Sequence, residues 1–305
     1  MPKIIVGIDE SDRSKDALVL GSQLARGSDS ELVLVCAYPY HEFPSRGAST
    51  GYGRFLREDA EAAIRHAQEE IADLPQITPY VDAELSPAKC IQSVAVRERA
   101  SLIVIGSSHH SAVGRLLAGT TAERLLHGAP CPVAVAPNGW RTREANAIRS
   151  IAVAYDRSEE AEAALIGAAA MAAALGARLR VVEVLDELWI GSPALMRGPG
   201  YNMPIRQLEE RMRKHLDEVV AGLPEAIAAD PVVIVGAPEP VLSAASEDVD
   251  MMVVGSRGYG PHRAVFLGSV SGRLVRDAAC PVLVVPRTIE APLEELFQVS
   301  DAETV

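Results

Sequence analysis

The chain has 305 residues, which at roughly 100–200 residues per domain predicts two domains or one large one. It carries 29 basic and 41 acidic residues, a formal net charge of −12, and so lacks the basic surface that a nucleic-acid-binding protein needs. Aromatic residues make up only 4% of the sequence, so the core must be built from Ala, Val, Leu and Ile, which favours helices layered on a sheet.

The cysteines Cys36, Cys90, Cys131 and Cys280 are spread along the chain without a CxxC pair. This spacing argues against a zinc ribbon or a disulfide scaffold and suits a reducing compartment. Cys36 ends an expected strand and is the first candidate for modification. No run approaches the roughly 18 apolar residues of a membrane helix, and the N-terminus shows no signal-peptide pattern. We therefore expect a soluble, cytoplasmic protein with no membrane partner.

In chain order, the first half alternates buried strands and helices. The apolar run 3–8 is typical of a strand buried on both faces, and 11–26 has helical spacing with Ser11 or Asp12 as N-cap. Further strands are expected over 32–37, 78–85, 102–105 and 133–136, and further helices over 55–72, 87–100 and 120–127. The second half repeats this order, with strands over 150–154, 179–185, 231–235, 251–254 and 282–285. Such alternation predicts an α/β fold with doubly wound parallel sheets and helices on both faces.

The two halves are copies of one unit. IIVGIDES at 4–11 matches IAVAYDRS at 151–158, and LIVIGS at 102–107 matches MMVVGS at 251–256. The offset is 147 residues at Asp9 and Asp156, and 149 at Gly106 and Gly255, which indicates duplication of a whole domain. We therefore expect domains over 1–140 and 150–288. An acidic tail over 289–305, with five acidic and no basic residues, is expected to be loosely ordered.

Ligands of an open parallel sheet bind beyond the carboxyl ends of its strands, where the strand order reverses. Asp9 and Asp156 end the first strand of each half, where a carboxylate can accept hydrogen bonds from ribose or help hold a metal on phosphates. The alternative is a helix N-cap. At the end of the second strand, backbone groups of Ala37 and Val184 could read an adenine edge, although small apolar residues are expected there in any case.

A glycine loop follows the fourth strand of the second half. It contains Gly255-Ser256-Arg257-Gly258, then nine residues, then Gly268-Ser269. Glycines let backbone amides approach phosphate, and a helix that begins at a Gly-Ser pair offers unpaired N–H groups to an anion. Ser269 and Ser271 can add hydroxyl donors. Arg257 could add charge, although a surface arginine is an equal alternative.

This G-x2-G-x9-G-[ST] loop after a buried VVG strand resembles the ATP-binding motif of the universal stress protein family. The opening strand with its Asp and the closing APCPV-type strand share the resemblance, which covers nearly the whole chain as two tandem copies. It implies a five-stranded parallel sheet of order 3-2-1-4-5 in each half. It also implies an internal pseudo-dimer paired through the last strands, 133–136 and 282–285. A homodimer and an unknown protein partner stay open.

The resemblance implies that Asp9 and Asp156 contact the nucleotide and that Gly119-Thr120 and Gly268-Ser269 bind phosphate. Together with the strand ends and the glycine loop, this gives the full set of residues that we expect to bind the nucleotide. In the first half these are Asp9, Ala37, Gly106, His109, Gly119, Thr120 and Thr121, and in the second half Asp156, Val184, Gly255, Arg257, Gly258, Gly268, Ser269, Val270 and Ser271. The first copy departs from the motif, because His109 stands where the second glycine should be. Its side chain could crowd the phosphates or donate a hydrogen bond to them, so nucleotide binding in the first half stays open.

The expected function is that of an ATP-binding sensor or regulator, with ATP bound alone or with Mg²⁺ and hydrolysed slowly or not at all. We identify no catalytic constellation and no metal site, since His109-His110 has no Cys or acidic cluster beside it. A P-loop is excluded because none of the four lysines follows a glycine. Two alternatives remain: a Mg²⁺-dependent ATPase or nucleotide-using transferase, and a first half that serves as an interaction scaffold without nucleotide.

Overall fold

The structure is a computed structural model of the chain. It describes residues 1–40, 50–107, 121–143, 147–186, 204–256, 268–286 and 293–297. The first half contains the strands β1 (Lys3–Gly7), β2 (Glu31–Tyr38), β3 (Ile77–Ala83), β4 (Leu102–Gly106) and β5 (Val133–Ala136), with the helices α1 (Asp12–Ser28), α2 (Thr50–Glu70), α3 (Pro87–Glu98) and α4 (Thr121–Leu126). The second contains β6 (Ser150–Ala154), β7 (Arg178–Leu185), β8 (Ala229–Val235), β9 (Met251–Gly255) and β10 (Val282–Val285), with α5 (Glu159–Leu175), α7 (Ile205–Ala221), α8 (Pro238–Ala245), α9 (Ser269–Asp277) and α10 (Leu293–Leu296).

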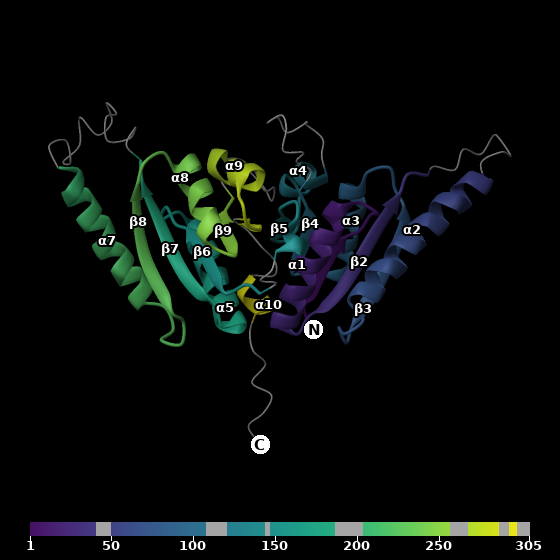
Figure 1. Ribbon diagram of the computed structural model, residues 1–305, viewed down its shortest axis with the longest axis horizontal. Coiled ribbons are helices and arrows are strands. Elements are labelled where there is room, and N and C mark those ends of the chain that lie inside the picture. The colour runs from purple at the N-terminus through teal and green to yellow at the C-terminus, as the bar shows by residue number, and fades with distance from the viewer. Residues whose placement is uncertain are drawn as a thin grey trace, which may run out of the picture.

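The strands of the described residues form one ten-stranded sheet of order β3-β2-β1-β4-β5-β10-β9-β6-β7-β8 (Figure 1). Within each half the strands are parallel and follow the expected 3-2-1-4-5 order, which confirms the predicted fold. The two predicted sheets are joined edge to edge, because β5 and β10 pair antiparallel with Ala134 opposite Leu283. These two residues are equivalent in the repeat, so an approximate two-fold axis passes between the halves.

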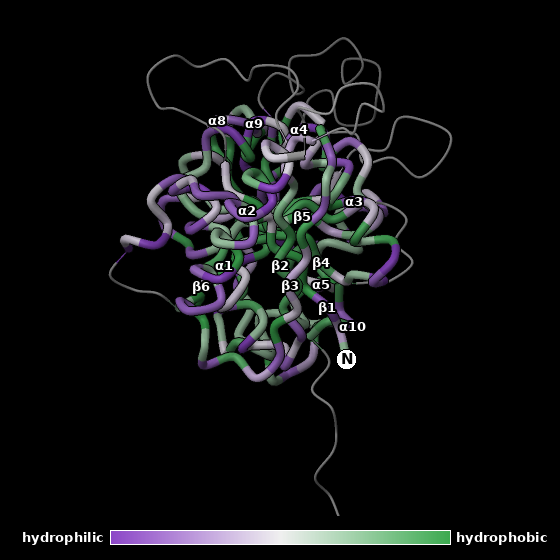
Figure 2. Tube along the Cα trace, turned by 90° about the vertical axis from the view of Figure 1, so that its right-hand side faces the viewer, coloured by the Kyte–Doolittle hydropathy of each residue, from purple (hydrophilic) through white to green (hydrophobic). Residues whose placement is uncertain are grey.

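Alternate residues of the buried strands face two different helical layers. Ile4 packs in a core with α1, α2, α5 and α7, whereas Ile5 packs in a second core with α3, α4, α8 and α9. In Figure 2 the hydrophobic colour accordingly concentrates along the strands and the polar colour along the outer surface. Both cores contain residues of both halves, so the halves share their hydrophobic interior.

The outer edges of the sheet carry prolines at matching places. β3 pairs with β2 so that Pro79 lies opposite Leu34, and β8 pairs with β7 so that Pro231 lies opposite Val181. Leu34 and Val181 are equivalent residues, 147 positions apart in the chain. Proline is tolerated at such positions because it lacks the N–H that a central strand would have to donate.

The junction between the halves is fixed to helix α1. Asp16, which is fully buried, accepts hydrogen bonds from the backbone N–H groups of Gly139 at 2.8 Å and Arg141 at 2.9 Å. Trp140 is 1% exposed, and the guanidinium of Arg143 lies 5.3 Å from its ring centroid. A buried carboxylate must be paired, so these bonds hold the linker in one place.

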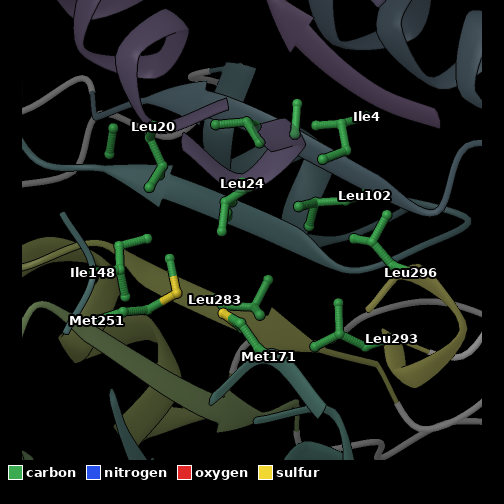
Figure 3. Close-up of a cluster of buried hydrophobic side chains, with 14 of the residues drawn as sticks. Ile4, Leu20, Leu24, Leu102, Ile148, Met171, Met251, Leu283, Leu293 and Leu296 are labelled. Atoms are coloured by element: carbon green, nitrogen blue, oxygen red, sulfur yellow. The ribbon is translucent and has the colours of Figure 1, made fainter. Parts of the chain in front are cut away.

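The tail differs from the sequence expectation. Residues Leu293, Leu296 and Phe297 are at most 3% exposed and belong to the core shared by both halves. Figure 3 shows Leu293 and Leu296 among residues such as Leu102 and Leu283. A side chain at Gly167 of α5 would come within 2.6 Å of Leu293, so this glycine makes room for α10. The expectation of a loosely ordered tail was therefore wrong for 293–297.

All four cysteines are unpaired and buried. The sequence made Cys36 the first candidate for modification, but its burial makes it inaccessible, so that expectation was wrong. Burial raises the pKa of the Cys36 thiol to about 12, and that of Cys90 to about 11. A raised pKa means that the reactive thiolate appears only at high pH. We expect the native thiols to react with Ellman's reagent at pH 8 at least a hundredfold more slowly than in urea. Rapid modification of the native protein would contradict this placement.

Within the described ranges, no helix combines the length and the apolar character needed to cross a membrane.

Candidate functional site

A cavity of about 560 Å³ opens at the carboxyl ends of β6, β7 and β9. β6 lies between β7 and β9, so the cavity is located where the chain switches direction across the sheet. The structure brings six of the predicted site residues together in its wall: Asp156, Val184, Gly255, Gly268, Val270 and Ser271. Ser269, the first residue of α9, lies between two of them in the chain.

Asp156 supports the N-cap of α5 without being the cap itself. Its Oδ1 accepts hydrogen bonds from the backbone N–H of Ser158 at 3.1 Å and from the Ser158 hydroxyl. The Ser158 Oγ in turn accepts the N–H of Ala161 at 3.2 Å and caps the helix. Within the described part of the chain, both bonds to Asp156 use Oδ1, which leaves Oδ2 for a ligand.

The first half has a smaller cavity of about 330 Å³ at the equivalent place, and Asp9, Ala37, Gly106 and Thr121 line it. Asp9 repeats the geometry of Asp156, since its Oδ1 accepts the N–H of Ser11 at 2.8 Å and the Ser11 hydroxyl. Ser11 is the N-cap of α1, one of the two candidates that the sequence offered. Each predicted Asp thus orders a helix start and still lines a cavity.

The remaining predicted residues are His109, Gly119, Thr120, Arg257 and Gly258, which lie outside the described residues. The effect of His109 on the first cavity therefore stays a prediction.

Gly106 and Gly255 allow a helix to approach the end of a strand closely. A Cβ on Gly255 would lie 2.8 Å from backbone and side-chain atoms of Glu160 in the first turn of α5. A Cβ on Gly106 would lie 2.6 Å from the carbonyl carbon of Arg13 in the first turn of α1. Arg13 and Glu160 are equivalent, so both copies need glycine here for packing, in addition to any approach of phosphate.

Helix α9 begins at the cavity without a side-chain cap. Its N-cap is Gly268, whose backbone is extended and which offers no side-chain acceptor to the first turn. The Ser271 hydroxyl donates to the carbonyl oxygen of Gly268 at 3.4 Å. The N–H groups of this first turn, with the partial positive charge of the helix end, can receive an anion.

The sequence reading missed an ion pair in the wall of the larger cavity. Arg157 Nε lies 2.7 Å from Oε1 of Glu183, and Arg157 Nη2 lies 3.2 Å from Oε2. The side chain of Glu183 is 8% exposed, whereas that of Arg157 is 45% exposed. An acid inside the apolar strand β7 was the available signal, since a buried carboxylate requires a partner.

A second polar group lies beside this ion pair. The Tyr155 hydroxyl donates a hydrogen bond to Glu162, and burial together with this bond raises the pKa of Tyr155 above its usual range. The ring of Tyr155 stacks on His215 of α7, with centroids 6.4 Å apart. Tyr155 thus stays neutral at physiological pH and joins β6 to the helices that cover it.

The two halves differ on the side of the sheet that α2 and α7 cover. In the second half, Leu208 and Met212 of α7 line the same cavity as Asp156. In the first half, a separate cavity of about 570 Å³ lies there, lined by His66 and Glu70 of α2 among others. No group of three His, Cys, Asp or Glu residues with metal-binding geometry occurs among the described residues.

Comparison with known proteins gives related chains that match either the whole chain or one of its halves. A universal stress protein of Mycobacterium tuberculosis is 26% identical over 296 residues, which cover 93% of this chain and 99% of that protein. The crystal structure of a universal stress protein from Archaeoglobus fulgidus matches with a TM-score of 0.66 at 21% identity, and covers 93% of this chain and 96% of its own. A universal stress protein solved in complex with cAMP matches 44% of this chain and 95% of its own at 22% identity, with a TM-score of 0.36.

A model of the universal stress protein family matches residues 1–137 and again residues 147–286. These two matches cover nearly all of both halves described above. The chain is therefore a tandem member of the universal stress protein family.

Proposed function

We propose that the chain binds an adenine nucleotide, ATP in the first place, in the cavity of its second half and acts as a nucleotide-dependent regulator in the stress response. One observation carries this proposal. The cavity at the switch point of the sheet brings together a carboxylate, Asp156, a close-packed glycine, Gly255, and the uncapped start of α9 at Gly268. A site of this composition is suited to a ribose and a phosphate chain.

Each element has a separate task in the proposed complex. The Oδ2 of Asp156 accepts a hydrogen bond from a ribose hydroxyl, and the first N–H groups of α9 with the Ser271 hydroxyl receive phosphate oxygens. The base lies against the end of β7, where Val184 lines the cavity on the side of β6 away from β9. Mg²⁺, where present, would neutralise phosphate charge, and Asp156 is the residue at hand to contact it.

We propose binding, and at most slow hydrolysis, because the described cavity wall offers little to phosphoryl transfer. Its charged side chains other than Arg157 are acidic: Asp156, Glu160, Glu183 and Asp186. Arg157 is already paired with Glu183. A preorganised free cation, which stabilises the charge of a transferring phosphoryl group, is therefore missing from this part of the wall.

The organisation of the chain fits a regulator with two nucleotide-binding folds. We propose domains over 1–140 and 150–288, which β5 and β10 join as an internal pseudo-dimer. The buried, unpaired cysteines support a cytoplasmic location, where thiols stay reduced.

Asp156→Asn tests the proposal without disturbing the fold. The asparagine Oδ1 can still accept both hydrogen bonds from Ser158, but its amide donates where Oδ2 would accept from the ribose. We expect calorimetry to show about tenfold weaker ATP binding at the second site, equivalent to about 1.4 kcal/mol, with an unchanged thermal midpoint.

Asp9→Asn is the matched control, because it makes the same change in the first half and leaves the second cavity intact. If the unmodified protein binds no ATP and releases no adenine nucleotide on denaturation, the proposed function is wrong. Rapid, steady release of phosphate from Mg-ATP, abolished by Asp156→Asn, would favour the ATPase alternative instead.

A further inference from the structure

Arg157 has a backbone conformation that its position does not explain. Three non-glycine residues among those described have a positive φ: Asp29 at 48°, Arg99 at 51° and Arg157 at 66°. Asp29 and Arg99 are left-handed C-caps, whose N–H groups bond to the last carbonyls of α1 and α3. Arg157 ends no helix and lies between Asp156 and the N-cap Ser158. Since this conformation is costly for arginine, another contact must hold the residue there.

The side-chain contact that the structure gives Arg157 is a bidentate ion pair, here called the fork, with Glu183. The guanidinium binds both carboxylate oxygens, at 2.7 Å and 3.2 Å, and the carboxylate is buried. Such a bidentate pair fixes the plane of the guanidinium as well as its position. The strained turn and the buried acid thus place one planar cation in a defined orientation.

The part of the Arg157 guanidinium that Glu183 does not contact lies in the cavity wall. Glu183 occupies the edge formed by Nε and Nη2, which leaves the faces of the guanidinium and the Nη1 edge, and the side chain is 45% exposed. Among the described residues that line the cavity, Arg157 is the one cationic side chain, and Leu208 and Met212 add apolar surface. A planar cation beside apolar walls fits a flat aromatic ring.

The strand order shows which part of a nucleotide it would meet. Arg157 follows β6 and is tied to the end of β7, whereas α9 starts beyond β9, on the other side of β6. Phosphates at the start of α9 would therefore lie away from Arg157. The base and ribose would lie toward it.

The first half has no counterpart of this pair. Glu10 and Cys36 occupy the positions equivalent to Arg157 and Glu183, 147 residues earlier in the chain. Glu10 is not among the residues with positive φ, and Cys36 is buried in the core. The bidentate ion pair is therefore present in only one of the two copies of the site.

We propose that Arg157, aligned by Glu183, is a base-recognition residue that stacks on the aromatic ring of the bound nucleoside, and that the second half thereby binds nucleosides in a way the first half does not. This inference rests on the nucleotide binding proposed above and adds the part of the ligand that this chain's own ion pair recognises.

The test measures binding of ATP and of adenosine to the full chain by calorimetry, with and without Arg157→Lys. Lysine keeps the positive charge beside Glu183 but lacks the planar fork. We expect about tenfold weaker binding of both ligands at the second site, because adenosine shares the ring and carries no phosphate.

Glu183→Gln distinguishes the effect of the orientation of the Arg157 guanidinium from the effect of its positive charge. It removes the buried carboxylate and frees the positive charge of Arg157, so a guanidinium that merely attracted phosphates would then bind ATP more tightly. We expect weaker binding of both ATP and adenosine, since the guanidinium loses its orientation. Arg178→Lys is the control, because Arg178 forms an exposed ion pair with Asp230 at 2.8 Å outside the cavity wall, and we expect it to change neither affinity.

The outcomes are distinct. Equal loss for ATP and adenosine in both variants of the fork supports the inference. Loss for ATP alone in Arg157→Lys, tighter ATP binding in Glu183→Gln, or unchanged affinities in a folded variant would overturn it while leaving the proposed function intact. Failure of the unmodified chain to bind either ligand would overturn both.

Discussion

Replacing Gly106 with alanine is expected to destabilise the protein by about 3 kcal/mol, near the upper end of the cost of overpacking a close contact. The new Cβ would collide with the backbone of Arg13, whose carbonyl carbon would lie 2.6 Å away. Backbone cannot swing aside as a flexible side chain does, so the first turn of α1 would have to move away from β4. Because Asp9 and Ser11 order that turn, the first cavity should widen as well.

Thermal or urea unfolding measures the effect, and two glycines calibrate it. Gly51→Ala in α2 is the control without a steric cost, because a Cβ there meets nothing within 4 Å, and we expect it to be stabilising by up to about 1 kcal/mol through helix propensity. Gly255→Ala should cost less than Gly106→Ala, since its nearest contacts, atoms of Glu160, would be 2.8 Å away. Equal stabilities for Gly106→Ala and Gly51→Ala would show that the approach of α1 to β4 is not tight.

Removal of residues 289–305 is expected to have the largest effect on stability of any change in the tail. It would take Leu293, Leu296 and Phe297 out of the shared core and expose the surface of α5 around Gly167. Truncating one fully buried leucine to alanine costs about 2–5 kcal/mol, so Leu296→Ala alone should lower stability by about 3 kcal/mol. The thermal midpoint, followed by circular dichroism, reports both losses.

Removal of residues 298–305 is the control for this experiment, because it takes away acidic residues and retains the three buried side chains. We expect it to leave the midpoint within about 1 °C, as surface changes usually do. If the two truncations lowered stability equally, the buried anchor at 293–297 would not be the cause.

The elements that could be predicted from the sequence are those with a strong local pattern. Continuous apolar runs at 3–8 and 102–105 predicted strands buried on both faces, and β1 and β4 are such strands. The repeat located the equivalent residues Asp9 and Asp156, and both line cavities at strand ends. The joining of β5 and β10 came from the family resemblance, since nothing local in a four-residue strand specifies its partner.

The features that the sequence did not predict depend on contacts between residues far apart in the chain, or on apolar patterns that neighbouring charged residues obscure. In the tail, acidic residues hid the apolar spacing of Leu293, Leu296 and Phe297, and the space at Gly167 lies far away in the chain. Helix α2 begins at Thr50, five residues before the helix that was expected over 55–72. At Gly53 a Cβ would lie 2.5 Å from the ring of Tyr40, so glycine lets this ring approach the helix closely. The pairing of Arg157 with Glu183 joins residues 26 positions apart and depends on a strained turn.

The prolines at the two outer strands have a consequence for how copies of this protein can associate. The inner edges, β5 and β10, are consumed by pairing with each other, so they are closed to another chain. At the outer edges, Pro79 and Pro231 each remove a donor from the row of groups that an added strand would need. These prolines therefore disfavour growth of the sheet from molecule to molecule at its two outer edges. We therefore expect copies of the protein to associate through their helical surfaces rather than by adding strands to the sheet.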